Sequence, residues 1–145
     1  KFVNGSPTFI VGSSWQLDEE VYAPYFDDKD NWKIVIASHE IDEHRLVEIE
    51  ERFAKHNPVR LSAIQSVEDV NSNSNCLIID CFGMLSSIYR YGHVAYIGGG
   101  FGVGIHNILE AAVFDIPVIF GPNNKRFREA QELKKIKGGF EVVLA

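Results

Sequence analysis

The sequence predicts an α/β fold, in which helices cover both faces of a doubly wound, mostly parallel sheet. Short apolar runs alternate with helical stretches along the whole chain, as strand–helix–strand units require. The run at residues 33–37 has no polar alternation, so both faces of that strand should be covered. The 145 residues, of which 46% are hydrophobic and 23% charged, suit one domain with one sizeable core.

Each predicted element takes its place from a local pattern. Strands are expected at the short apolar runs, at residues 7–11, 33–37, 59–61, 76–80, 94–97, 117–120 and 140–144. Helices are expected between them, at residues 17–25, 42–55, 84–91, 107–114 and 126–135. The second helix is the clearest, because Leu46, Ile49 and Phe53 fall on one side at i, i+3 and i+7. The polar run at residues 71–75 predicts an exposed loop.

Composition and charge exclude several classes of protein. Fourteen Lys and Arg against 20 Asp and Glu leave a net charge of −6 with His neutral, so no overall basic field favours nucleic acid. No apolar run approaches the roughly 18–20 residues of a membrane-spanning helix. The start of the chain does not resemble a signal peptide. Both ends look cut, which predicts a fragment of a longer protein.

The two cysteines, Cys76 and Cys81, make neither a disulfide framework nor a zinc pattern. Both are expected to be reduced residues of the core. No self-contained catalytic centre stands out elsewhere, and we expect neither a metal nor a cofactor.

The strongest local signal is a glycine-rich loop at residues 98–104, which holds five of the twelve glycines. Glycines let the backbone turn freely and let a ligand come close. The loop follows a predicted strand and opens a predicted helix, where free N–H groups favour an anion such as phosphate. Its spacing is neither the dinucleotide fingerprint nor a Walker A loop. The alternative is a flexible strand–helix turn without a ligand.

Polar residues gather where this loop meets the predicted helix. Asn107 is able to cap the helix, and a carboxylate at Glu110 suits the positive end of the helix dipole. In the functional interpretation, Glu110 instead accepts hydrogen bonds from a sugar diol, as carboxylates do in many nucleotide sites. Both interpretations stay open from the residues alone.

Polar side chains also follow other predicted strands, at the sheet edge where ligands of such folds bind. Ser13 and Ser14 follow the first strand, and such residues either bind phosphate or cap a helix. His39 follows the second strand, where a ligand contact and a solvated turn are both compatible with the pattern. Residues 125–137 carry a net charge of +4, which predicts either a solvated helix or an anion-facing patch.

Taken together, these segments resemble the 3-deoxy-D-manno-octulosonic acid (Kdo) transferases, which add Kdo to the lipid A precursor. Five motifs match in order over nearly the whole chain. They are Gly12-Ser13-Ser14-Trp15 through Asp18-Glu19; Ala37-Ser38-His39-Glu40; Asp80-Cys81-Phe82-Gly83-Met84-Leu85; Gly98-Gly99 through His106-Asn107-Ile108-Leu109-Glu110; and Gly121-Pro122 with Phe127.

The resemblance implies a Rossmann-like, doubly wound parallel sheet over residues 1–145, the C-terminal half of a GT-B glycosyltransferase. In the family that half binds the donor, CMP-Kdo. By resemblance, the nucleotide would be held at Ala37 and Ser38, at Phe82, Gly83 and Met84, and at Asn107, Ile108, Leu109 and Glu110. Further donor contacts are expected at Ser13, Ser14, His39, Gly99, Gly100 and His106.

The chain departs from the family pattern at three segments, one of which is the glycine-rich loop, since it lacks the usual Arg-Gly-Gly and is slightly shorter. Ala37-Ser38 stands where the family has Pro-Arg, so a cationic contact is lost, and Met84 stands where the family has Glu. Lys125, Arg126 and Arg128 are candidates for the missing positive charge.

The resemblance also implies what lies outside this chain. In the family, the general base is a Glu of the N-terminal, acceptor-binding half, which also carries the membrane anchor. We therefore expect the full-length protein to be an inverting transferase at the cytoplasmic face of the bacterial inner membrane. We expect this chain alone to bind a nucleotide without transferring sugar.

Two other functions stay open. The donor-binding half of another GT-B enzyme, one that uses a UDP-sugar, would share the glycine loop and the ribose-binding Glu. A non-catalytic Rossmann-like binding domain is the other. Preference for CMP over UMP, or failure to bind any nucleotide, would separate the three.

Overall fold

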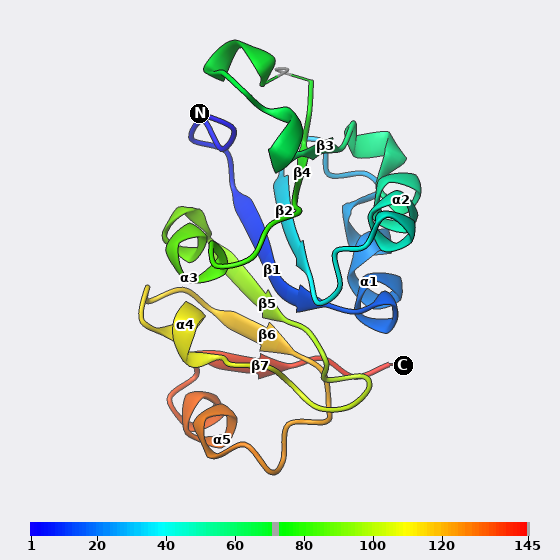
Figure 1. The fold of residues 1–145 in the computed structure, drawn as a ribbon. Helices are drawn as coiled ribbons and strands as arrows, with labels where there is room; N and C mark the ends of the chain where they lie inside the picture. The colour runs from blue at the N-terminus through cyan, green and yellow to red at the C-terminus, as the bar shows by residue number, and fades with distance from the viewer. Residues whose placement is uncertain (71–72, 145) are drawn as a thin grey trace.

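The computed structural model describes residues 1–70 and 73–144. In this part of the chain, a seven-stranded sheet runs through the molecule (Figure 1). Its strands are β1 (Thr8–Ser14), β2 (Lys33–Ser38), β3 (Val59–Arg60), β4 (Cys76–Ile79), β5 (Val94–Ile97), β6 (Val118–Phe120) and β7 (Gly139–Glu141). All neighbours pair in parallel, in the order β3-β4-β2-β1-β5-β6-β7. The predicted parallel sheet is confirmed.

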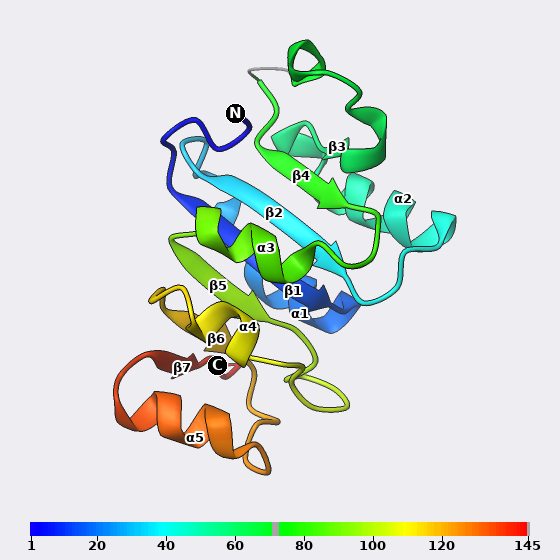
Figure 2. The same ribbon diagram turned by 60° about the vertical axis from the view of Figure 1, so that its left-hand side comes forward.

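Helices cover both faces of this sheet, as the sequence predicts. They are α1 (Gln16–Tyr22), α2 (Glu43–Arg52), α3 (Leu85–Ile88), α4 (Leu109–Ala112) and α5 (Arg128–Lys135). α1 and α2 lie on one face, and α3, α4 and α5 lie on the other (Figures 1 and 2). No helix among the described residues combines the length and the hydropathy needed to cross a bilayer.

Each face of the sheet has its own core, because alternate side chains of a strand point to opposite faces. Ile10 of β1 packs in the cluster under α3, α4 and α5, whereas Phe9 and Val11 pack in the cluster under α1 and α2. The predicted apolar side of α2 is confirmed, since Leu46 and Ile49 are buried in that second cluster.

Several predicted bounds differ from the structure. β1 continues to Ser14, because that residue pairs with Ser38 at the end of β2. The end of the helix predicted at residues 84–91 forms a separate 3-10 helix, at Tyr89–Tyr91. Of the loop predicted to be exposed, residues 71 and 72 lie outside the described part. Ser74 in that loop is only 2% exposed, because its hydroxyl donates to the carbonyl of Asn57 at 2.6 Å.

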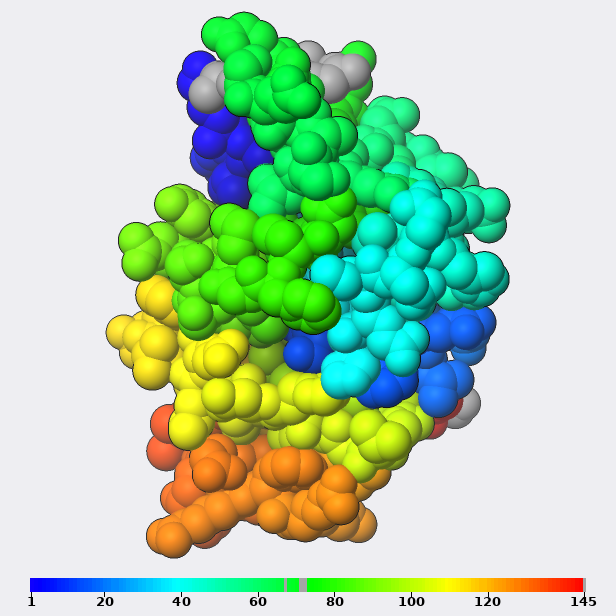
Figure 3. Space-filling model, in the orientation of Figure 1, coloured from blue at the N-terminus to red at the C-terminus, as the bar shows by residue number. Residues whose placement is uncertain are grey.

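The order of the strands indicates at which edge of the sheet a ligand is expected to bind. From β1 the chain proceeds to β2 on one side, and after β4 it crosses to β5 on the other side of β1. In sheets of this kind the ligand crevice lies beyond the carboxyl ends of the strands, where the order reverses. The loops that follow β1, β2, β4 and β5 meet on the face shown in Figure 3, where blue, cyan, green and yellow-green segments adjoin.

Candidate functional site

A cavity of about 350 Å³ lies at this edge of the sheet, and we call it the β1–β2–β4 cavity. Its lining comes from the ends of the three strands, from the segments that follow them and from His106, two residues after the glycine-rich loop: Ser13, Ala37, Ser38, His39, Ile41, Ile79, Cys81, Phe82, Gly83, Leu85 and His106. Residues that lie up to 93 positions apart in sequence, Ser13 and His106, thus border one space. Seven of the predicted donor-site residues are brought together here.

A second cavity of about 240 Å³, the α4 cavity, adjoins the first and shares His106 with it. Its lining includes Asn107, Ile108 and Leu109 together with Phe127 and Glu129. Ile108 as a whole is only 3% exposed and packs in the core, so it offers a ligand little surface.

Other predicted contacts lie outside the lining of both cavities. Met84 is 37% exposed, and its sulfur lies 3.3 Å from the thiol of Cys81. Glu110 is half-buried in the first turn of α4. Cys81 is exposed rather than part of the core, which corrects the expectation for that cysteine, whereas Cys76 is buried as expected.

Ser14, Gly99 and Gly100 make contacts within the protein instead of lining a cavity. The hydroxyl of Ser14 is fully buried and donates to Glu19 Oε1 at 3.0 Å. The N–H of Gly99 donates to Asp18 Oδ2 at 3.0 Å. At Gly100, a Cβ would lie 2.5 Å from the backbone nitrogen of Gly121. The side chain of Ser14 is thus engaged within the protein and the two glycines serve close packing, while the donor contacts expected at these three residues stay predictions.

The same account extends to most of the glycine-rich loop. A Cβ at Gly98 would lie 2.1 Å from the carbonyl oxygen of Ser13, and one at Gly99 would lie 2.1 Å from that of Gly104. Gly99 and Gly104 also adopt positive φ angles of +97° and +125°. Gly102, in contrast, has open space around it. Close backbone approach therefore explains Gly98, Gly99 and Gly100 without a ligand, and the positive φ of Gly104 together with the nearby side chains of Arg126 and Phe127 explains a fourth.

The helix expected to open at Asn107 begins two residues later and has only four residues, Leu109–Ala112. Asn107 Oδ1 accepts the N–H of Leu109 at 3.0 Å. In the structure, Asn107 thus pairs a backbone N–H at the start of the helix, as the capping interpretation predicts. The N–H of Leu109 is therefore already paired within the protein.

Three aromatic rings cluster beside the β1–β2–β4 cavity. Trp15 stacks on His39, with ring centroids 4.2 Å apart and an interplanar angle of 20°. The indole Nε1 of Trp15 donates to His106 Nε2 at 3.2 Å. Partial burial and the neighbouring His39 lower the pKa of His106, against a smaller opposing effect of Asp18. Trp15 belongs to the first of the five motifs, but the sequence analysis assigned it no contact with His106.

Asp18 connects the two loops that border this cluster. Its carboxylate is 1% exposed and accepts the N–H of Trp15 at 2.9 Å, the N–H of Gly99 at 3.0 Å and the hydroxyl of Tyr96 at 2.9 Å. The next residue, Glu19, is also buried, and it pairs with Arg45 of α2.

No Lys or Arg lines either cavity in the described part of the chain. Arg126, a candidate for the missing charge, donates instead to the carbonyl of Val103 at 2.6 Å and lies over the ring of Phe127. Lys125 and Arg128 are exposed. Within residues 1–70 and 73–144, no three His, Cys, Asp or Glu side chains are grouped so as to hold a metal ion.

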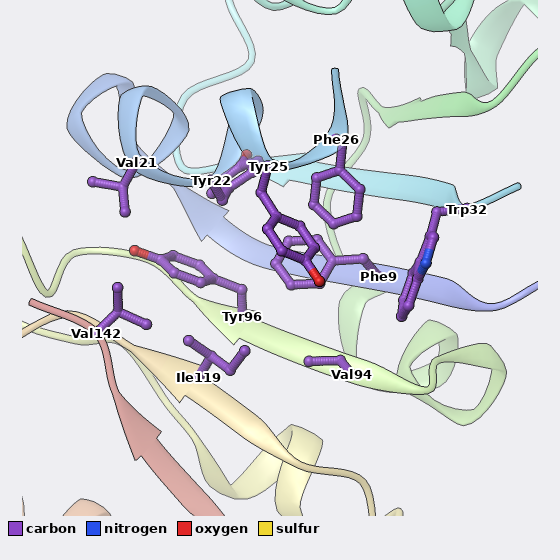
Figure 4. A pocket seen from close by; sticks show the side chains of 10 residues that line it. All are labelled: Phe9, Val21, Tyr22, Tyr25, Phe26, Trp32, Val94, Tyr96, Ile119 and Val142. Carbon is purple, nitrogen blue, oxygen red and sulfur yellow. The ribbon is translucent and has the colours of Figure 1, made fainter. Parts of the chain in front are cut away.

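A third cavity, of about 290 Å³, lies on the other face of the sheet, between α1 and the strands β5 and β6 (Figure 4). Phe9, Tyr25, Trp32 and Ile119 are among its lining residues, which are all aromatic or aliphatic. Its lining offers few of the polar groups that orient a nucleotide. It is therefore not our candidate for the nucleotide site.

No family model matches the chain. Among curated proteins, the 3-deoxy-D-manno-octulosonic acid transferase of Aquifex aeolicus is 39% identical over 74 residues, which make up 50% of this chain and 21% of that protein. The transferase of the same name from Chlamydophila psittaci is 30% identical over 117 residues, 79% of this chain and 26% of that protein. The chain is a homologue of the Kdo transferases. The resemblance expected from the motifs is confirmed.

This Kdo transferase homologue spans about a quarter of the length of the curated relatives that it matches. The fold has a solved counterpart in the crystal structure of the C-terminal CMP-Kdo binding domain of WaaA from Acinetobacter baumannii. The two share a TM-score of 0.78 at 21% sequence identity, over 97% of this chain and 75% of that one. The Rossmann-like fold class is thus confirmed.

Proposed function

We propose that this chain is the donor-binding part of a glycosyltransferase that transfers Kdo from CMP-Kdo to the lipid A precursor. One observation carries the proposal. Segments expected from separate motifs to hold the nucleotide, Ala37-Ser38 and Phe82-Gly83, border one cavity at the edge where ligands of such sheets bind. The names of the curated relatives and of the solved counterpart support the choice of donor.

The cavity offers a nucleotide both apolar and polar contacts. Phe82 is 79% exposed at the rim, where an aromatic face is able to stack on a base. The hydroxyl of Ser38 now donates to the carbonyl of Ser14 at 3.3 Å, a long bond that a better acceptor would replace. In the adjoining α4 cavity, Asn107 and Leu109 would face the ribose, and Glu110, beside this lining in the first turn of α4, would accept from its diol.

The chemistry requires more than this chain. Inverting displacement at the anomeric carbon needs a general base, which the family resemblance places in an N-terminal half. We propose that this chain contributes by holding the CMP leaving group and by donating hydrogen bonds to its phosphate, which stabilises the charge that develops there. Because the acceptor is a lipid, the full-length protein would work at a membrane surface, on the cytoplasmic side by likeness to the family.

The test uses the full-length protein with CMP-Kdo and the lipid A precursor. We expect release of CMP and a gain in acceptor mass of whole Kdo units, with no transfer from UDP-N-acetylglucosamine in a parallel reaction. The 145-residue chain alone should produce neither. Transfer from the UDP-sugar, or robust transfer by the 145 residues alone, would contradict the proposal.

A further inference from the structure

The hydrogen bond between Trp15 and His106 determines where His106 carries its proton. An indole N–H is a donor only. Since Trp15 Nε1 lies 3.2 Å from His106 Nε2, that ring nitrogen must accept, and it holds no proton. In a neutral imidazole the single N–H is then at Nδ1.

Among residues 1–70 and 73–144, the Nδ1 atom of His106 makes no hydrogen bond. The Cδ2 edge of the ring faces the glycine-rich loop, 3.2 Å from the position that a Cβ on Gly99 would take. The Nδ1 edge is on the other side of the ring. His106 lines both the β1–β2–β4 cavity and the α4 cavity, so this donor belongs to a side chain that borders the candidate ligand space on two sides.

The surroundings keep this arrangement in place. The ring of His39 lies 4.7 Å from that of His106 and stacks on Trp15, which packs the imidazole of His106 against two aromatic neighbours. Partial burial and His39 both lower the pKa of His106, while the Asp18 carboxylate raises it less. The neutral form with an accepting Nε2 is therefore the form favoured near pH 7.

A ligand phosphate would need such a donor at this place. The lining of the two cavities contains no Lys or Arg in the described part of the chain, and Ser38 stands where a cation is expected. Anionic oxygens would thus depend on neutral N–H and O–H donors, which form strong hydrogen bonds to charged acceptors.

We propose that Trp15 is a positioning residue that holds His106 in its Nδ1–H tautomer, and that this N–H donates to a phosphate oxygen of the bound nucleotide. The second half of this inference rests on the proposed function. The first half concerns the ligand-free protein and stands by itself.

The first test records two-bond ¹⁵N–¹H correlations of the histidine side chains in the ligand-free protein at pH 7.5. We expect His106 to show a protonated Nδ1 and an unprotonated Nε2. Trp15→Phe keeps an aromatic ring on His39 but removes the donor, so the Nε2–H tautomer should become populated. A protonated Nε2 in the unsubstituted protein would overturn the inference.

The second test adds CMP to the same sample and compares two replacements of His106. The Nδ1 resonance of the unsubstituted protein should shift on binding. In His106→Asn the side-chain amide lies near the position of Nδ1, whereas in His106→Gln it reaches toward that of Nε2. We expect His106→Asn to retain more CMP affinity, and His106→Gln and Trp15→Phe to weaken binding about 2–10-fold.

The two proposals fail in different ways. If CMP shifts the amides of Ser38 and Gly83 while His106 Nδ1 stays unchanged, the inference is wrong and the proposed function stands. If CMP shifts no resonance of the folded protein, the proposed function fails for this chain and the phosphate contact falls with it. Equal losses of affinity in both His106 variants would also contradict the contact.

Discussion

The buried carboxylate of Asp18 should stabilise the fold and the loops around the site together. It accepts three hydrogen bonds, from the N–H groups of Trp15 and Gly99 and from the hydroxyl of Tyr96, at 2.9–3.0 Å. Asp18→Asn keeps the shape and one acceptor oxygen. Its amide nitrogen is able to donate to Tyr96, so the geometry can persist with neutral bonds in place of charge-assisted ones.

The magnitude follows from that change of bond type. A hydrogen bond to a charged group contributes about 1.5–3 kcal/mol, and a neutral one about 0.5–1.5 kcal/mol, so three bonds together lose about 3 kcal/mol. Removing a buried charge offsets part of this loss, because its desolvation cost also disappears. We expect Asp18→Asn to lower the free energy of unfolding by about 2 kcal/mol.

Urea denaturation followed by circular dichroism measures this loss, and hydrogen exchange at the Gly99 amide locates it. The matched control is Glu20→Gln in the same helix, since the side chain of Glu20 is 49% exposed and lies 3.9 Å from Arg52. We expect the control to change stability by less than about 0.5 kcal/mol. The reasoning is refuted if the two variants lose the same stability and Gly99 keeps its protection in Asp18→Asn.

Three further outcomes can be measured on the same protein. Glu110→Gln should weaken CMP binding by about 1–3 kcal/mol in calorimetry, because it replaces a charged acceptor of the ribose diol by a neutral one. Unchanged affinity would leave Glu110 as a helix-start residue. Gly100→Ala should destabilise the fold by about 2 kcal/mol or more in urea denaturation, because its Cβ would lie 2.5 Å from Gly121 N. Gly102 has open space around it, so Gly102→Ala should cost less than about 1 kcal/mol. Equal losses of stability in the two variants would contradict the packing account. Folding lowers the pKa of His106, so the unfolded chain binds this proton before the folded chain does as the pH falls below about 6.5. The free energy of unfolding should therefore fall more between pH 7.0 and 5.5 in the unsubstituted protein than in His106→Asn. Identical pH dependences of the two proteins would rule this out.

Much of the fold was predictable from local pattern. Apolar runs without polar alternation, such as residues 34–37, predict strands covered on both faces, and the spacing of Leu46 and Ile49 predicts the buried side of α2. Bounds set by pairing were less accessible. β1 extends to Ser14 because a neighbouring strand supplies a partner there, which no pattern within the segment reveals.

The site was predictable in part, because the carboxyl ends of parallel strands meet at one edge. Ser38 and Gly83 border the same cavity, as two separate motifs implied. The glycine-rich loop was harder to interpret, since the same residues serve a ligand or close backbone packing, and only the contacts of Gly98 and Gly100 separate these roles. The bond from Trp15 to His106 spans 91 positions, so the sequence alone held no sign of it.

The central claim is that the β1–β2–β4 cavity binds the CMP part of the donor. The most direct test titrates the protein with CMP, UMP and AMP and follows its backbone amides by NMR. The account predicts that CMP alone, at matched concentrations, shifts the amides of Ser38, Gly83 and Asn107 to Glu110. A preference for UMP, or a folded protein in which none of these amides moves with CMP, would contradict it.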